Sequence, residues 1–143
     1  MGIFGTRDRR PFTLTPDLCL AIGMVYTTAS DGRLGETERH DLRKVVPDER
    51  VLHAALDYCR SHATTEFLVA CVAMLSAQQK LCLLLNMADA AMVDGELADE
   101  EREVLREFQA AFEVADETMA PHLASLALKN ARHLFAAGGR PGA

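Results

Sequence analysis

The feature that most constrains the fold is a string of residues that the chain contains twice. The pattern Asp-Gly-x-Leu-x-x-x-Glu-Arg-x-x-Leu begins at Asp31 and begins again at Asp94, 63 residues later. The same offset also pairs three earlier positions, matching Cys19, Leu20 and Met24 to Cys82, Leu83 and Met87. Self-similarity at one fixed offset indicates two copies of a single supersecondary unit. We interpret the unit as a helix–loop–helix with the Asp-Gly pair in its loop.

Helix-start signals and apolar spacing divide the chain into about seven short helices. Thr15, Pro16 and Asp17 are typical of a helix beginning, and Ser76 with Gln79 forms a capping box. The helices are expected at residues 17–30, 36–46, 48–61, 65–75, 76–93, 99–112 and 116–136. The segment 65–75 is almost wholly apolar, so it is expected at the centre. No segment alternates apolar and polar residues over a useful length, so no strand is expected.

These signals predict an all-α fold, with about seven short helices in one globular bundle. The two helix–loop–helix repeats are expected to be pseudo-symmetric, related by an approximate two-fold axis. The 143 residues suit a single domain with a core of its own. We place this helical domain at residues 15–137, after an extended N-terminal arm at 1–14 and before a disordered tail at 138–143.

The charge and composition exclude several classes of function. A net charge of −6 argues against nucleic acid, which needs clustered positive charge on its partner. No apolar stretch is long enough to span a bilayer, and no signal peptide is evident, which favours a cytoplasmic protein. The four cysteines contain no CxxC pair and are expected to be small buried thiols. No nucleophile is paired with a base, so no catalytic activity is expected.

Helix capping explains much of the repeated motif. Glu38 and Glu101 fall at the third position of the helix that follows each loop, where a carboxylate can accept a hydrogen bond from the cap residue. Negative charge near a helix N-terminus also contributes about 0.3–1 kcal/mol per group. Asp31 and Asp94 are different, because each is expected just after a helix C-terminus, where negative charge is disfavoured.

Two explanations remain open for Asp31 and Asp94. Asp-Gly is a favourable turn pair, because the aspartate side chain can bind nearby backbone N–H groups. Alternatively, a hard divalent cation such as Ca²⁺, Mg²⁺ or Mn²⁺ binds the aspartate, loop carbonyls and the glutamate seven residues later. The second explanation makes the metal ligands Asp31, Glu38, Asp94 and Glu101. The loops are not EF-hands, because the alternating acids and the closing glutamate are absent.

The repeated motif resembles that of the TerB tellurite-resistance family and the wider TerB-like superfamily. The runs at residues 79–87 and 127–130 are also similar to that family, and the resemblance covers about 17–135. It implies an all-α bacterial cytoplasmic domain whose acidic loops bind a divalent metal, again through Asp31, Glu38, Asp94 and Glu101. The chain departs from the family at the helix caps, where it has Gly35 and Ala98 instead of Ser, Thr or Asp.

Two functions from different classes follow. The resemblance implies a chemical-stress or tellurite-resistance protein that binds a divalent metal and acts with protein partners associated with the membrane. The alternative is a metal-free helical module for protein interaction, in which the acidic loops only cap helices. Neither alternative is an enzyme.

Overall fold

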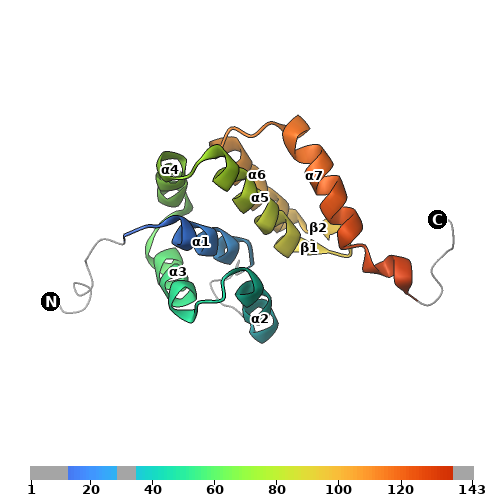
Figure 1. Cartoon of the computed structure of the whole chain (residues 1–143), viewed down its shortest axis with the longest axis horizontal. Coiled ribbons are helices and arrows are strands. Elements are labelled where there is room, and N and C mark those ends of the chain that lie inside the picture. The colour runs from blue at the N-terminus through green and yellow to red at the C-terminus, as the bar shows by residue number, and fades with distance from the viewer. Residues whose placement is uncertain (1–12, 29–34, 137–143) are drawn as a thin grey trace.

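The computed structural model describes residues 13–28 and 35–136, and this part of the chain is almost entirely helical (Figure 1). The elements are α1 (Pro16–Thr28), α2 (Glu36–Val45), α3 (Glu49–Ser61), α4 (Thr64–Met74), α5 (Ala77–Ala91), β1 (Met92–Val93), β2 (Glu96–Leu97), α6 (Asp99–Ala111), α7 (Asp116–Lys129) and η1 (Arg132–Phe135), a short 3₁₀ helix. The all-α prediction of about seven short helices is confirmed. The arm at 1–14 and the tail at 138–143 fall largely outside the described residues.

Helix α1 lies at the centre of the bundle, between α3 and α5 (Figure 1). Its sequence is apolar on nearly every side, and eight of its thirteen residues are buried. At Gly23 the side chain of Leu83 on α5 packs against the α1 backbone, because a Cβ atom there would lie 2.7 Å from Cδ1 of Leu83. The absence of a side chain at Gly23 therefore lets α1 and α5 approach closely.

Aromatic rings join the helices that surround α1. The Phe67 ring of α4 lies 5.9 Å from Phe108 of α6 and 5.6 Å from Tyr26 of α1, measured between ring centroids. Phe67 and Phe108 are both fully buried. Such tilted and edge-on ring pairs contribute about 0.5–1.5 kcal/mol beyond the apolar area they bury. This cluster ties α1, α4 and α6 into a single core.

The prediction that the segment 65–75 is central is wrong. Helix α4 lies at the edge of the bundle, and its buried residues are limited to Phe67, Leu68 and Cys71. Val69 is 72% exposed on the opposite side, and Met74 is 39% exposed. The apolar composition of α4 therefore does not reflect burial on all sides, and α1 occupies the central place instead.

A two-residue hairpin follows α5, where no strand was expected. Strands β1 and β2 pair antiparallel, with Met92 opposite Leu97 and Val93 opposite Glu96. Both residues of the connecting turn, Asp94 and Gly95, have positive φ angles, of 52° and 84°. Two positive φ angles define a type I′ turn, for which Asp-Gly is a preferred pair. Helix α5 consequently ends at Ala91 and not near Val93.

Two predicted helix starts have the expected caps. The Ser76 hydroxyl accepts a hydrogen bond from the Gln79 N–H (3.1 Å), and the Gln79 side chain accepts one from the Ser76 N–H (2.8 Å). At α1 the Thr15 hydroxyl accepts a hydrogen bond from the Leu18 N–H (3.3 Å). Helix α7 is shorter than predicted, because it ends at Lys129 and the chain then forms η1.

The relation between the two repeats remains a prediction. The first helices of the two units, α1 and α5, pack against each other, and each is followed by a second helix. However, most of the first loop, residues 29–34, lies outside the described residues. The superposition of the two loops is therefore not tested.

We predict that Gly95→Ala destabilises the protein by about 2 kcal/mol or more. A Cβ atom at Gly95 would combine a positive φ angle with a position 2.7 Å from the backbone oxygen of Ala127 in α7. Asp94→Asn is the matched control, because asparagine also accepts the type I′ turn, and its stability should change by less than about 0.5 kcal/mol. Urea unfolding measures both variants, and equal stabilities would contradict the role of Gly95.

Candidate functional site

The structure describes three of the four predicted metal ligands. Glu38 lies in the first turn of α2, Asp94 in the hairpin turn and Glu101 in the first turn of α6. Asp31 lies outside the described residues. Within residues 13–28 and 35–136, no three His, Cys, Asp or Glu side chains converge as a metal site would require. The role of the four residues as metal ligands therefore stays a prediction.

Glu38 caps the start of α2. Its Oε1 atom accepts a hydrogen bond of 2.5 Å from the backbone N–H of Gly35. Gly35 has no side chain with which to cap the helix, so this reciprocal half of the capping box satisfies an otherwise unpaired donor. The structure thus gives Glu38 a local role that needs no cation.

The sequence predicts that Asp94 lies directly after a helix C-terminus. The structure places it elsewhere. Helix α5 ends three residues earlier, and Asp94 occupies the first central position of the hairpin turn. Its side chain is exposed. The turn preference of Asp-Gly therefore accounts for this aspartate without a metal, although it leaves the carboxylate open to solvent.

Glu101 is partly buried but does not cap its helix. Helix α6 begins after Ala98, and no side chain forms a hydrogen bond at this cap. Within the described part of the chain, Glu101 accepts no hydrogen bond and forms no ion pair. Asp99 and Glu100 precede it, so three carboxylates gather at the N-terminus of α6, where the helix dipole favours negative charge.

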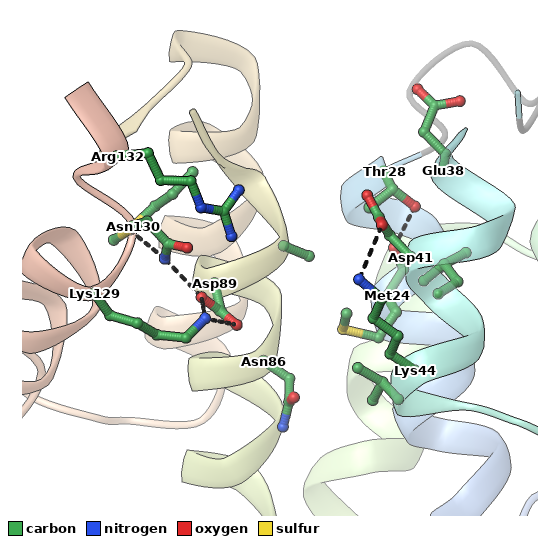
Figure 2. Close-up of a pocket in the computed structure, with 14 residues that line it drawn as sticks. Met24, Thr28, Glu38, Asp41, Lys44, Asn86, Asp89, Lys129, Asn130 and Arg132 are labelled. Atoms are coloured by element: carbon green, nitrogen blue, oxygen red, sulfur yellow. Dashed lines mark hydrogen bonds and ion pairs between the residues drawn. The ribbon is translucent and has the colours of Figure 1, made fainter. Parts of the chain in front are cut away.

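A polar cleft of about 300 Å³ lies between α2 and the C-terminal half of α1 on one side and α5 and the end of α7 on the other (Figure 2). Side chains of α1 and α2 form one wall, and side chains of α5, the end of α7 and the start of η1 form the other. The polar and charged residues that line it are Thr28, Glu38, Asp41, Lys44, Asn86, Asp89, Lys129, Asn130 and Arg132. Glu38 is the single predicted site residue among them.

Asp89 organises the α5–α7 wall. Its Oδ1 atom accepts hydrogen bonds from Nδ2 of Asn130 (2.7 Å) and from Nζ of Lys129 (3.1 Å). Asn130 Nδ2 also lies 2.9 Å from the backbone oxygen of Leu126, which closes the last turn of α7. These contacts fix the end of α7 against α5, although the residues are 40 and 41 positions apart in sequence.

The same contacts determine the charge state of Asp89. Partial burial raises the pKa of Asp89, but the hydrogen bonds from Asn130 and Lys129 and the positive charge of Arg132 together outweigh this effect. The net pKa lies below the ordinary value of 3.8, so Asp89 is ionised at neutral pH. The negative charge of Asp89 therefore balances the positive charge of Lys129.

Two other charged residues of the cleft, Arg132 and Asp41, form few ion pairs with the described residues. The guanidinium of Arg132 extends into the cleft (Figure 2) and forms no ion pair with any residue in the described ranges. On the facing wall, Asp41 has a single ion pair, 3.7 Å to Lys44 of its own helix, and both side chains are well exposed. An exposed pair of this kind contributes little, about 0–1 kcal/mol, so Asp41 can exchange Lys44 for another cation at small cost.

Sequence reasoning did not identify the α5–α7 wall. Lys129 and Asn130 were part of a run that resembles the TerB family, but nothing in their spacing assigned them a contact. Asp89 has the pattern of an ordinary helix-surface acid. An asparagine directly after a helix is common at helix C-termini, but this signal does not indicate the contact of Asn130 with Asp89.

Compared with protein-family models, with curated proteins and with solved structures, the chain has no match. The relationship to the TerB family therefore stays a prediction from the repeated motif. Within the described residues, no helix is long and apolar enough to cross a membrane.

We predict that Asp89→Asn destabilises the protein at neutral pH by about 1 kcal/mol. The reason is that the hydrogen bonds from Lys129 and Asn130 weaken, at a site that is partly exposed to solvent. The pKa of Asp89 is lowered by folding, so its contribution is present above its ordinary pKa of 3.8 and disappears as the pH falls below that value. Urea unfolding from pH 7 to about pH 3 should therefore show the wild type and the variant converging at the acidic end.

The control for this prediction is Asp57→Asn. Asp57 is an exposed acid on α3 whose ion pair with Arg60 spans a single helical turn (3.5 Å). Its loss should change the free energy of unfolding by less than about 0.5 kcal/mol. A difference between wild type and Asp89→Asn that persists unchanged at low pH would contradict the assignment of an ionised Asp89.

Proposed function

We propose that the protein is a non-enzymatic binding module of the TerB type, whose polar cleft receives a segment of a protein partner. The resemblance to the TerB family suggests that this partner belongs to a cytoplasmic chemical-stress system with membrane-associated components. The observation behind this proposal is that the two walls carry opposite charges, Arg132 and Asp41. Within the described residues Arg132 forms no ion pair, and Asp41 forms a single exposed one. A cleft that holds opposite charges on facing walls suits a segment that carries both an acidic and a basic side chain.

Two further features support this proposal. Asp89, Lys129 and Asn130 hold one wall in place, so the cleft exists before a partner arrives. Preorganisation of this kind reduces the entropy lost on binding. In addition, Glu38 of the repeated motif lines the opposite wall and caps the start of α2. The motif and the long-range contacts of Asp89 therefore shape the same cleft.

We predict that the double variant Asp41→Asn/Arg132→Gln loses partner proteins that the wild type retains in affinity capture from cell extract. The expected loss is about tenfold, equivalent to about 1.4 kcal/mol. The matched control is Glu103→Gln/Arg106→Gln, which removes the same two charges from exposed positions of α6 outside the cleft. Retention of the same proteins by the cleft variant, at the same yield as the control, would contradict the proposal.

Cation binding at the acidic loops is a second candidate function. The favouring observation is that Asp94 is exposed, and that Glu101 has no hydrogen-bond partner in the described part of the chain. Oxygen ligands from these carboxylates and from loop carbonyls would suit Ca²⁺, Mg²⁺ or Mn²⁺. On this proposal the first loop would contribute Asp31 and Glu38 in the same way.

Thermal unfolding in EDTA and in millimolar Ca²⁺, Mg²⁺ or Mn²⁺ distinguishes the candidates. Cation binding predicts a higher Tm with one of these ions, and loss of this increase in Asp31→Asn and Asp94→Asn. Glu38→Gln should instead lower the stability of the cation-free protein by about 0.5 kcal/mol, because the charge near the α2 N-terminus is lost. A wild-type Tm that ignores all three ions would eliminate the cation function and leave the binding cleft as the remaining proposal.

A further inference from the structure

The two walls of the polar cleft carry opposite net charges. On the α1–α2 wall, two acids and one base line the cleft and leave one negative charge, from Glu38, Asp41 and Lys44. On the α5–α7 wall, one acid and two bases leave one positive charge, from Asp89, Lys129 and Arg132. A segment bound in the cleft therefore meets a negative wall on one side and a positive wall on the other (Figure 2).

Pairing within each wall shows which charges are left for a ligand. The Nζ atom of Lys129 lies 3.1 Å from Oδ1 of Asp89, so Arg132 holds the unbalanced positive charge. On the facing wall, Lys44 pairs with Asp41 of the same helix, and Glu38 lies one helical turn before Asp41. One lysine faces two carboxylates there, so the unbalanced negative charge belongs to these two acids of α2.

The position of these charges on facing walls restricts the conformation of a ligand. A segment that pairs with both walls directs an acidic side chain to Arg132 and a basic side chain to α2 in the opposite direction. In an extended chain, side chains at odd spacings point to opposite sides, and those at even spacings point to the same side. In a helix, residues three or four positions apart share one face and would meet a single wall.

Uncharged side chains in the cleft also favour an extended ligand. The amides of Asn86 and Asn130 and the hydroxyl of Thr28 each donate to the backbone oxygen four residues earlier, at 2.9 Å in every case. Their own oxygens accept no hydrogen bond from residues 13–28 or 35–136. The Asn86 amide also contacts the thiol of Cys82 (3.4 Å), which is exposed, contrary to the expectation of buried cysteines.

These three oxygens line the cleft as acceptors without a donor among the described residues. An extended backbone brings N–H groups that have no partner of their own. The N–H groups of a helix are instead bonded to its own carbonyl groups. The acceptors and the facing charges therefore indicate the same kind of ligand.

We propose that the cleft binds an extended segment in which an acidic and a basic residue are separated by an odd number of positions, as in an adjacent pair. The acidic side chain pairs with Arg132, and the basic side chain pairs with Asp41 and Glu38. This inference rests on the function proposed above, and it adds the conformation of the partner segment and the spacing of its charges.

Three peptides of identical composition test this spacing. Their sequences are Thr-Thr-Asp-Lys-Thr-Thr, Thr-Asp-Thr-Lys-Thr-Thr and Thr-Asp-Thr-Thr-Lys-Thr, which separate the charges by one, two and three positions. Acetylated and amidated ends remove the terminal charges, and β-branched threonine favours an extended backbone. Titration of each peptide into the isotope-labelled full chain, followed by amide NMR shifts, measures its affinity and its place of binding.

We expect spacings of one and three to bind about fivefold more tightly than a spacing of two, because the even spacing loses one exposed ion pair of about 1 kcal/mol. The largest shifts should fall within residues 36–45 and 129–135. Arg132→Gln should remove this preference, because one of the two walls loses its unbalanced charge. The preference should persist in the control Glu103→Gln/Arg106→Gln, whose substitutions lie outside the cleft.

Equal affinity for the spacings of one and two in the wild type would overturn the inference. Shifts that avoid the cleft with all three peptides, or a preference that survives in Arg132→Gln, would also overturn it. None of these results removes the proposed function itself. That function fails if the cleft variant Asp41→Asn/Arg132→Gln captures the same partner proteins as its control, so the two failures are distinguishable.

Discussion

The structure depends on the close packing of α1 against α5 and α3. Helix α1 has eight buried residues among thirteen, and Gly23 brings its backbone within reach of Leu83 on α5. No other helix in the described part of the chain contributes as many buried residues to the core. The first helices of the two predicted repeats, α1 and α5, meet at this contact.

The contact between α1 and α5 also produces the cleft. Helix α2 follows α1, and the hairpin and α7 pack against α5 (Figure 1). Polar side chains of the two groups therefore face each other across the cleft (Figure 2). Gly95 brings the hairpin against the backbone of Ala127, and Asp89 binds Asn130, three residues after Ala127. The acidic motif therefore contributes to the architecture of one wall, through its turn, before any ligand is considered.

Local signals allowed the sequence to predict the helices and several of their caps. Ser76 and Gln79 are three residues apart, and their reciprocal bonds depend on little else. The place of α4 was mispredicted, because its composition does not reveal that Val69 faces solvent. The Asp89–Asn130 contact spans 41 residues, and only the packing of α5 against α7 creates it. A site made by long-range contacts of this kind leaves no periodic signature in a single sequence.

The proposed partner segment would bind between α2 and the end of α7. Hydrogen exchange of the protein alone and saturated with a captured partner measures this directly, because amides covered by a bound segment exchange more slowly. We expect added protection at residues 36–45 and 126–135, with little change in α3 and α4. Protection confined to α4, or spread evenly over the core helices, would contradict it.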